Sequence, residues 1–282
     1  MSIAMNTISR SDFDYIRELV RHRSAIVLEA DKAYLIETRL TPLARQRGFD
    51  SLQALIASLR SGAGDGLARQ VVEAMTTHET SFFRDFHPFE TLRTTVLPEL
   101  LAKRPPGQPL TIWCAACSSG QEPFSVAMLA HEHFPTLIRG RLRIVATDLS
   151  GAILAQARDG VYSQTEINRG LPTAALARYF DKQGARWRIK SEIRRLVDFQ
   201  QSNLAEAWPP LPLLDVVFMR NVLIYFGLET RKMILARVRG ILKPDGYLFL
   251  GSSETTLNLD AAFEPVFLGK TVCYQLRQTG IP

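Results

Sequence analysis

The chain has 282 residues, enough for one large domain or two smaller ones, and its 46% apolar and 22% charged residues are ordinary for a globular protein. No run of about 18 apolar residues occurs, so we expect no membrane span. Three cysteines are too few for a disulfide framework, which makes the reducing cytoplasm the expected location. The net charge of +6 comes from cations scattered among acids, so on charge alone nucleic acid and an acidic protein surface are equally good partners.

Residues 1–77 are predicted to form several short helices. Apolar side chains recur three or four positions apart, for example at Leu67, Val71 and Met75. Earlier in this region the sequence interleaves acids with four cations, Lys32, Arg39, Arg45 and Arg47. That pattern fits either an ordinary exposed helix or a basic face that attracts an acidic partner.

Residues 78–109 are expected to connect these helices to an α/β domain, with a helix near 88–103. The apolar runs expected to be strands are 110–115, 142–147, 196–200, 214–219, 246–251 and 266–276. The segments expected to be helices are 121–134, 150–158, 172–180 and 228–242. We expect a turn at K-P-D-G, a closing antiparallel hairpin from the last two strands, and a small insertion within 160–200.

The most specific pattern runs from Thr111 to Asp148. A strand feeds the turn A-A-C-S-S-G and a helix, and the next strand ends in the acid Asp148. Small residues in such a turn let a ligand approach the backbone, and an acid at the tip of the next strand can accept hydrogen bonds from ribose hydroxyls. Gly120 is the only glycine of the turn, so the pattern is not the pyrophosphate-binding G-x-G-x-x-G. S-adenosylmethionine, which carries no phosphate, suits this turn better.

Several motifs together identify a resemblance. They are T-x-x-x-T-S-F-F-R (76–84), S-S-G-Q-E-P-F-S-V-A (118–127), A-T-D (146–148), S-N-L (202–204) and M-R-N-V-L-I-Y-F (219–226), with the less specific L-K-P-D-G-Y-L-F-L-G-S-S-E (242–254). In this order they make the chain similar, over nearly its whole length, to the CheR-type chemotaxis-receptor glutamate O-methyltransferases.

The resemblance implies an α/β fold: a Rossmann-like methyltransferase sheet, a small all-helical N-terminal domain and a small antiparallel β insertion. The implied domains are a receptor-docking domain at 1–77, a connecting segment at 78–109 and a domain binding S-adenosylmethionine at 110–282. The implied partner is the cytoplasmic part of a chemoreceptor, with no nucleic acid and no insertion into the membrane. Some members grip a tethering peptide with the insertion, whose sequence here looks more like that of tether-independent members.

The resemblance also implies the site. The residues it assigns to the cofactor are His78, Thr80, Arg84, Glu122, Asp148, Asn203, Leu204, Arg220 and Asn221. Those it assigns to catalysis are Arg84, Arg220 and Tyr225. The chain departs from the family pattern at His78, where the family often has Asn, and at Gln121, where Glu is usual.

The chemistry expected of a glutamate acceptor is simple. Its pKa of about 4.3 makes it an anion at neutral pH, so no general base is needed and positioning is the main task. The guanidinium of Arg84 suits the acceptor carboxylate, unless Arg84 only caps the next helix. Asn221 and Tyr225 follow the strand 214–219, where side chains face the ligand crevice, although a tyrosine there can also be a core residue. Asp148 can bind ribose or cap the helix near Ser150.

Two further patterns are interpreted without function. The pair Cys114 and Cys117 has the spacing of a redox or zinc motif, but no second pair accompanies it, so packing at a strand end is favoured and no metal site is predicted. H-E-H at 131–133 is expected on a solvated helix face.

Two rival functions remain open: a methyltransferase acting on another substrate, such as RNA or a small molecule, and a non-catalytic docking module that senses S-adenosylmethionine.

Overall fold

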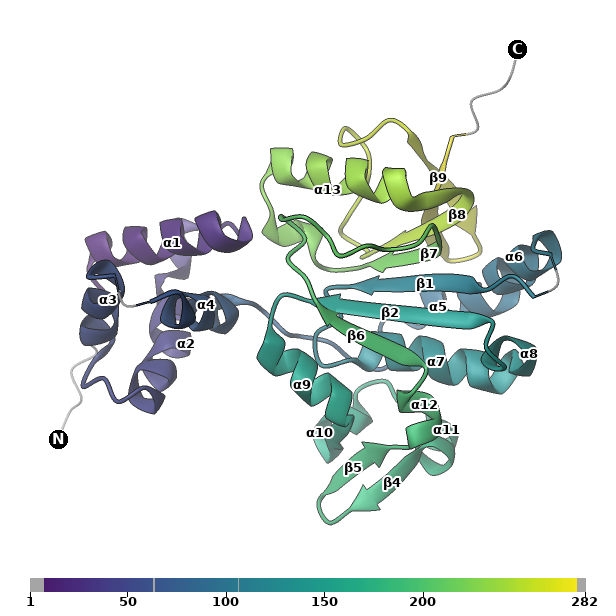
Figure 1. The fold of residues 1–282 in the computed structure, drawn as a ribbon, viewed down its shortest axis with the longest axis horizontal. Coiled ribbons are helices and arrows are strands. Elements are labelled where there is room, and N and C mark those ends of the chain that lie inside the picture. The colour runs from purple at the N-terminus through teal and green to yellow at the C-terminus, as the bar shows by residue number, and fades with distance from the viewer. Residues whose placement is uncertain (1–7, 63, 106, 278–282) are drawn as a thin grey trace. The chain divides into compact units, whose positions relative to one another are not determined.

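The structure, a computed structural model, describes residues 8–62, 64–105 and 107–277 (Figure 1). The chain divides into two compact units. The first comprises the residues up to Thr77 together with Tyr225–Thr230, and the second comprises His78–Ile224 and the residues from Arg231. Across the described residues, every helix is too short or too polar to cross a bilayer.

The first unit is a small bundle of four α-helices. They are α1 (Arg10–Ser24), α2 (Ala33–Gln46), α3 (Leu52–Arg60) and α4 (Asp65–Met75), with a 3₁₀ turn, η1 (Ala30–Lys32), before α2. Their apolar stripes meet in one core, in which Ile16, Ile36 and Leu55 are fully buried. The helical N-terminal domain expected from the sequence is confirmed.

The expected basic face of this unit is only partly available. Arg39 donates to the main-chain oxygens of Met75 and Thr76, at 2.6 and 3.1 Å. An arginine in this position satisfies carbonyls that the end of α4 leaves without helical partners. The Nζ of Lys32 lies 3.4 Å from the Oδ2 of Asp31. Arg39 therefore stabilises the end of a helix and does not belong to a free basic surface.

The short segment Tyr225–Thr230 packs with the first unit although it is remote in sequence. The N–H of Val27 donates to the oxygen of Tyr225 at 2.9 Å, and Ile26 forms an isolated antiparallel bridge with Phe226. The end of the motif M-R-N-V-L-I-Y-F thus lies in this unit.

The second unit is built on a seven-stranded sheet in the order β6-β2-β1-β7-β8-β10-β9. The strands are β1 (Leu110–Ala115), β2 (Leu142–Asp148), β6 (Val197–Gln201), β7 (Leu214–Met219), β8 (Leu242–Leu250), β9 (Phe263–Leu268) and β10 (Thr271–Leu276). The first five in this order are parallel, and β10 is antiparallel to both of its neighbours. The order reverses beside β1, so the carboxyl ends of β1 and β2 border the crevice where α/β sheets bind ligands.

Helices cover both faces of this sheet (Figure 1). One face carries α7 (Gln121–His133), α9 (Gly151–Asp159) and the run α5 (His87–Thr91), η2 (Leu92–Val96) and α6 (Leu97–Lys103), of which η2 is π-helical. The other face carries α13 (Leu228–Ile241). Both faces of β1 are buried, which explains why it reads as a continuous apolar run. The short helix α8 (Pro135–Ile138) precedes β2.

A separate three-stranded antiparallel sheet, in the order β3-β5-β4, forms the insertion. Its strands are β3 (Val161–Ser163), β4 (Phe180–Gln183) and β5 (Arg186–Ile189), accompanied by α10 (Gln164–Asn168), α11 (Thr173–Tyr179) and α12 (Ser191–Arg194). The small antiparallel β insertion expected from the sequence is confirmed, as is the α/β class of the larger sheet.

Two expectations near the C-terminus are wrong. The K-P-D-G sequence does not separate a helix from a strand, because β8 already begins at Leu242 and the register with β7 shifts there. The segment 266–276 is not one strand, because a turn at Gly269 and Lys270 divides it into β9 and β10. These two strands form the hairpin, and β8 pairs with β10 on one side and β7 on the other.

Candidate active site

The turn after β1 has a backbone conformation that lets a ligand approach the main chain closely. Ala116, Ser118 and Gly120 have φ angles of 55°, 52° and 92°, in the left-handed region. A Cβ on Gly120 would lie 3.1 Å from the Cβ of Ala157, so the helix packing behind the turn leaves little room there. The turn therefore needs glycine at position 120, and buried polar contacts hold the rest of it.

Asp148, at the end of β2, is the main contact of this turn. Its Oδ2 accepts from the N–H of Ser118 at 2.8 Å, and its Oδ1 accepts from the N–H of Ser150 at 3.0 Å. Ser150 itself caps α9 by accepting from the N–H of Ile153. Burial raises the pKa of Asp148, and the hydrogen bonds from these N–H groups oppose the rise.

The donors and acceptors around Asp148 fit a ribose diol. A carboxylate has about four acceptor positions, and the backbone N–H groups of Ser118, Ser150 and Leu149 use part of them. The N-cap of α9 is Ser150, so the alternative that Asp148 caps this helix is wrong. Asp148 organises the turn that precedes the helix. Its contact with ribose stays a prediction.

His78 and Thr80 lie within the motif T-x-x-x-T-S-F-F-R (76–84) and are both half-buried. The Oγ of Ser118 donates to the main-chain oxygen of His78 at 3.0 Å, which ties this segment to the turn after β1. Their contacts with the cofactor stay predictions.

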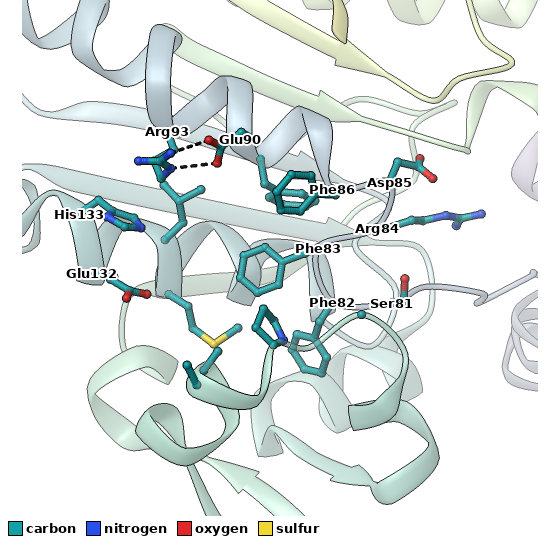
Figure 2. A pocket seen from close by; sticks show the side chains of 17 residues that line it. Ser81, Phe82, Phe83, Arg84, Asp85, Phe86, Glu90, Arg93, Glu132 and His133 are labelled. Carbon is teal, nitrogen blue, oxygen red and sulfur yellow. Dashed lines mark hydrogen bonds and ion pairs between the residues drawn. The ribbon is translucent and has the colours of Figure 1, made fainter. Parts of the chain in front are cut away.

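The segment that carries Arg84 has an unusual backbone. Phe83, Asp85 and Phe86 have φ angles of 48°, 66° and 51°, which cost about 1–3 kcal/mol each for residues with a Cβ. Figure 2 shows the result: Arg84 and Asp85 point away from the ring of Phe83. Beside the rings is a cavity of about 520 Å³ with a mixed lining. Its apolar part includes Phe83, Phe89 and Met128, and its polar part includes Arg84, Asp85, Glu90, Arg93, Glu132 and His133.

Arg220 holds this segment from within the protein. Its Nη2 lies 2.6 Å from Asp85 Oδ2 and 3.1 Å from the main-chain oxygen of Arg84, and its Nη1 lies 3.1 Å from Glu122 Oε2. Only 2% of the Arg220 side chain is exposed, and the guanidinium also lies over the ring of Phe89. Burial raises the pKa of Glu122, and the charge of Arg220 opposes this rise.

These contacts distinguish the two arginines predicted to be catalytic. The guanidinium of Arg220 is already bound to two carboxylates. Arg84 is half-buried and donates to the main-chain oxygen of Glu79 at 3.0 Å, and it makes no ion pair within the part of the chain that the structure describes. A guanidinium with a neutral partner can exchange it for a carboxylate at little cost. Arg84 thus remains the better candidate for contacting the substrate.

Asn203 and Leu204 follow β6, which lies beside β2. Asn203 Oδ1 accepts from the N–H of Ala205 at 3.0 Å, and the indole of Trp208 donates to the oxygen of Leu204 at 3.1 Å. The side-chain oxygen of Asn203 and the main-chain oxygen of Leu204 are thus both engaged within this loop, and contact with an adenine stays a prediction for both residues.

Asn221 directly follows Arg220, in the loop after β7, and has a φ of 58°. Its N–H donates to Glu254 Oε2 at 2.7 Å. Tyr225, at the end of η3 (Leu223–Tyr225), belongs to the first unit. The catalytic role of Tyr225 and the cofactor contact of Asn221 stay predictions.

Sequence reasoning missed two carboxylates. Asp85 follows the F-F-R motif directly, and Glu254 ends the motif at 242–254 that was regarded only as typical of methyltransferases. Their partners, Arg220 and the loop after β7, are remote in sequence. The only signals in the sequence were that Asp85 adjoins a recognised motif and that Glu254 lies inside one.

The cysteine pair is buried and unbonded. Burial raises the pKa of both Cys114 and Cys117 well above the usual thiol range, which makes them inert packing groups. Among the described residues, no cluster of three His, Cys, Asp or Glu side chains could hold a metal ion.

Comparison with known proteins agrees with this geometry. Residues 11–76 match the family described as "CheR methyltransferase, all-alpha domain", and residues 78–272 match "CheR methyltransferase, SAM binding domain". Chemotaxis protein methyltransferase 1 of Pseudomonas aeruginosa is 44% identical over 95% of this chain and 99% of its own length. Chemotaxis protein methyltransferase Cher2 of Pseudomonas putida is 43% identical over 94% of this chain and 98% of its own. A relative from Vibrio parahaemolyticus, named chemotaxis protein methyltransferase, is 36% identical over 96% of this chain and 98% of its own length.

Proposed function

The chain belongs to the CheR methyltransferase family, and we propose that it transfers methyl groups to glutamate side chains on the cytoplasmic helices of chemoreceptors, forming methyl esters. Its SAM-binding domain makes it a methyltransferase dependent on S-adenosylmethionine. The receptor as partner, and with it a cytoplasmic place of action, is supported by the relatives' name, chemotaxis protein methyltransferase. One observation supports glutamate as the substrate. Arg220 is already paired with carboxylates of the protein, whereas Arg84 donates only to a main-chain oxygen and is available to a substrate carboxylate.

The cofactor pocket proposed here borders the carboxyl ends of β1, β2, β6 and β7. Asp148 accepts from the ribose hydroxyls, and Asn203 with the main chain of Leu204 borders the adenine. His78, Thr80, Glu122, Arg220 and Asn221 surround the rest of the cofactor. When bound, S-adenosylmethionine supplies the methyl group, whose bond to sulfur breaks, with the electron pair staying on sulfur, as a glutamate oxygen bonds to the carbon.

Arg84 aligns the carboxylate of the glutamate acceptor. The acceptor is already ionised, so the enzyme must align it rather than deprotonate it, and alignment of this kind can supply about 7–11 kcal/mol of a barrier. A guanidinium contacts a carboxylate through two parallel hydrogen bonds and fixes its plane. Arg220 fixes the main chain of Arg84 through the 3.1 Å contact to its oxygen. The family resemblance adds Tyr225 to the residues proposed for catalysis.

The experiment uses the purified chain, receptor-containing membranes and S-adenosylmethionine labelled in its methyl group. We expect label on the receptor that mild base releases as methanol, because esters hydrolyse where methylated amines do not. Arg84→Ala should abolish most of the labelling. Label that resists base, or no label on any receptor, contradicts the proposal.

A further inference from the structure

One carboxylate collects an exceptional number of backbone donors. Glu254 accepts from five N–H groups, those of Gly251, Asn221, Val222, Leu223 and Ile224, over 2.7–3.3 Å. Two of these donors lie in the loop that follows β7, two lie in η3, and Gly251 directly follows β8. Glu254 therefore joins the ends of two neighbouring parallel strands on the edge that faces the ligand crevice.

The loop held in this way contains a left-handed residue. Asn221 has a φ of 58°, a region that asparagine adopts more readily than most residues with a Cβ, and the hydrogen bond from its N–H to Glu254 holds it there. Gly251 belongs to the same arrangement. A Cβ at Gly251 would lie 2.7 Å from Asn221 Nδ2 and 2.9 Å from Asn221 N, so only glycine permits this approach.

Glu254 itself is not available to a ligand. A carboxylate offers about four acceptor positions, and five N–H groups already occupy both of its oxygens. Its negative charge compensates aligned backbone donors that would otherwise point into the loop unpaired, and such charge-assisted bonds are about twice as strong as neutral ones. Its effect on the reaction must therefore pass through the residues it holds.

We propose that Glu254 is a positioning residue for cofactor binding: it locks Asn221 in the left-handed conformation that presents its side chain to the amino-acid part of the cofactor. This rests on the proposed function only in that Asn221 borders the cofactor. It assigns a role to a residue that touches neither cofactor nor substrate, and it predicts that disturbing Glu254 changes cofactor affinity before it changes turnover.

The test measures binding of S-adenosylhomocysteine by calorimetry, and KM for S-adenosylmethionine and kcat on receptor membranes, in the full-length chain. Glu254→Gln keeps the size of the side chain but turns an amide NH₂ toward backbone donors. We expect binding and KM to worsen by about tenfold or more, with kcat at saturating cofactor within about threefold. Glu264→Gln, which removes the same charge from an exposed position on β9, should leave all three unchanged.

A second variant separates positioning from folding. Gly251→Ala keeps the charge of the carboxylate but pushes a methyl group against both Asn221 and Glu254 Oε2, and we expect the same weakening of binding. Unchanged binding in both variants, or a loss in kcat without a loss in affinity, overturns the proposal. The binding measurement needs no receptor, so a chain that binds the cofactor normally but labels no receptor would refute the proposed substrate and leave the role of Glu254 decided by its own data.

Discussion

Arg220 Nη2 lies 2.6 Å from Asp85 Oδ2, joining two residues 135 positions apart in the sequence. The pair connects the loop after β7 with the strained segment that carries Arg84, and a second carboxylate, Glu122, completes the partners of the buried guanidinium. Two anions on one buried cation are an arrangement that fixes the cation in place. The main chain of Arg84 is thus held by Arg220, which is itself held by Asp85 and Glu122.

Asp85→Asn tests this relationship. The amide keeps the shape of the side chain but removes one of the two charges on Arg220, and the segment bearing Arg84 loses one of its anchors. We expect kcat on receptor membranes to fall by about tenfold, with affinity for S-adenosylhomocysteine within about threefold. The matched control is Asp159→Asn, an exposed aspartate at the end of α9. Equal turnover in both variants would leave Asp85 without a positioning role.

Asp148→Asn should have the opposite effect to Asp85→Asn: it should weaken cofactor binding and leave turnover nearly unchanged. An amide replaces one carboxylate oxygen by an NH₂ that faces the N–H of Ser118 or Ser150 and cannot accept from a ribose hydroxyl. Affinity for S-adenosylhomocysteine should fall by about tenfold or more, whereas kcat at saturating cofactor should change by less than about threefold. Calorimetry and initial rates check this, and an unaltered affinity would refute the ribose contact.

The sequence predicts features of the fold that depend on neighbouring residues better than those that depend on contacts between distant parts of the chain. The limits predicted for β1 and β7 match the structure, because a strand buried on both faces is a continuous apolar run with polar ends. The turn at Gly269 and Lys270 escaped prediction because strand-forming residues flank it closely on both sides, so the run looked unbroken. Here the two-residue turn was the only signal.

The site divides in the same way. The Ser118–Asp148 contact follows from parallel pairing of β1 with β2, which brings the two strand ends together, and the sequence pattern predicts that proximity. The roles of Asp85 and Glu254 depend on side chains meeting loops far away in the chain, and no periodicity encodes such meetings. A motif gave Arg84 its role, but only the fold explains what holds it.

The opposite edge of the sheet supports a prediction about stability. Asp215, fully buried at the start of β7, accepts from Arg104 Nε, Lys243 Nζ and the N–H of Thr111, all at 2.9 Å. Asp215→Ala leaves Lys243 without its carboxylate and Arg104 with only Asp245, and should lower the free energy of unfolding by about 3 kcal/mol. Urea unfolding measures this, with the exposed Asp198→Ala as the control. A loss equal to that of the control would contradict it.

Asp245, close to this cluster, should make stability depend on pH. Its hydrogen bond with Arg104 lowers the pKa of Asp245 below the usual range. A carboxyl whose pKa is lower in the folded chain contributes stability above its unfolded pKa and loses it as the pH falls through the folded pKa. The difference in unfolding free energy between the wild-type chain and Asp245→Asn should therefore be largest near neutral pH and shrink below about pH 5. A difference that grows on acidification would contradict this assignment.

The most direct test of the account identifies the modified atom. Receptor membranes are incubated with the full-length chain and S-adenosylmethionine carrying a deuterated methyl group, and the receptor peptides are sequenced by tandem mass spectrometry before and after alkaline treatment. The account predicts deuterated methyl groups on glutamate side chains of cytoplasmic helices, lost on alkaline treatment and absent with Arg84→Ala. Methyl groups on lysine, arginine or cysteine, surviving alkali, would contradict it.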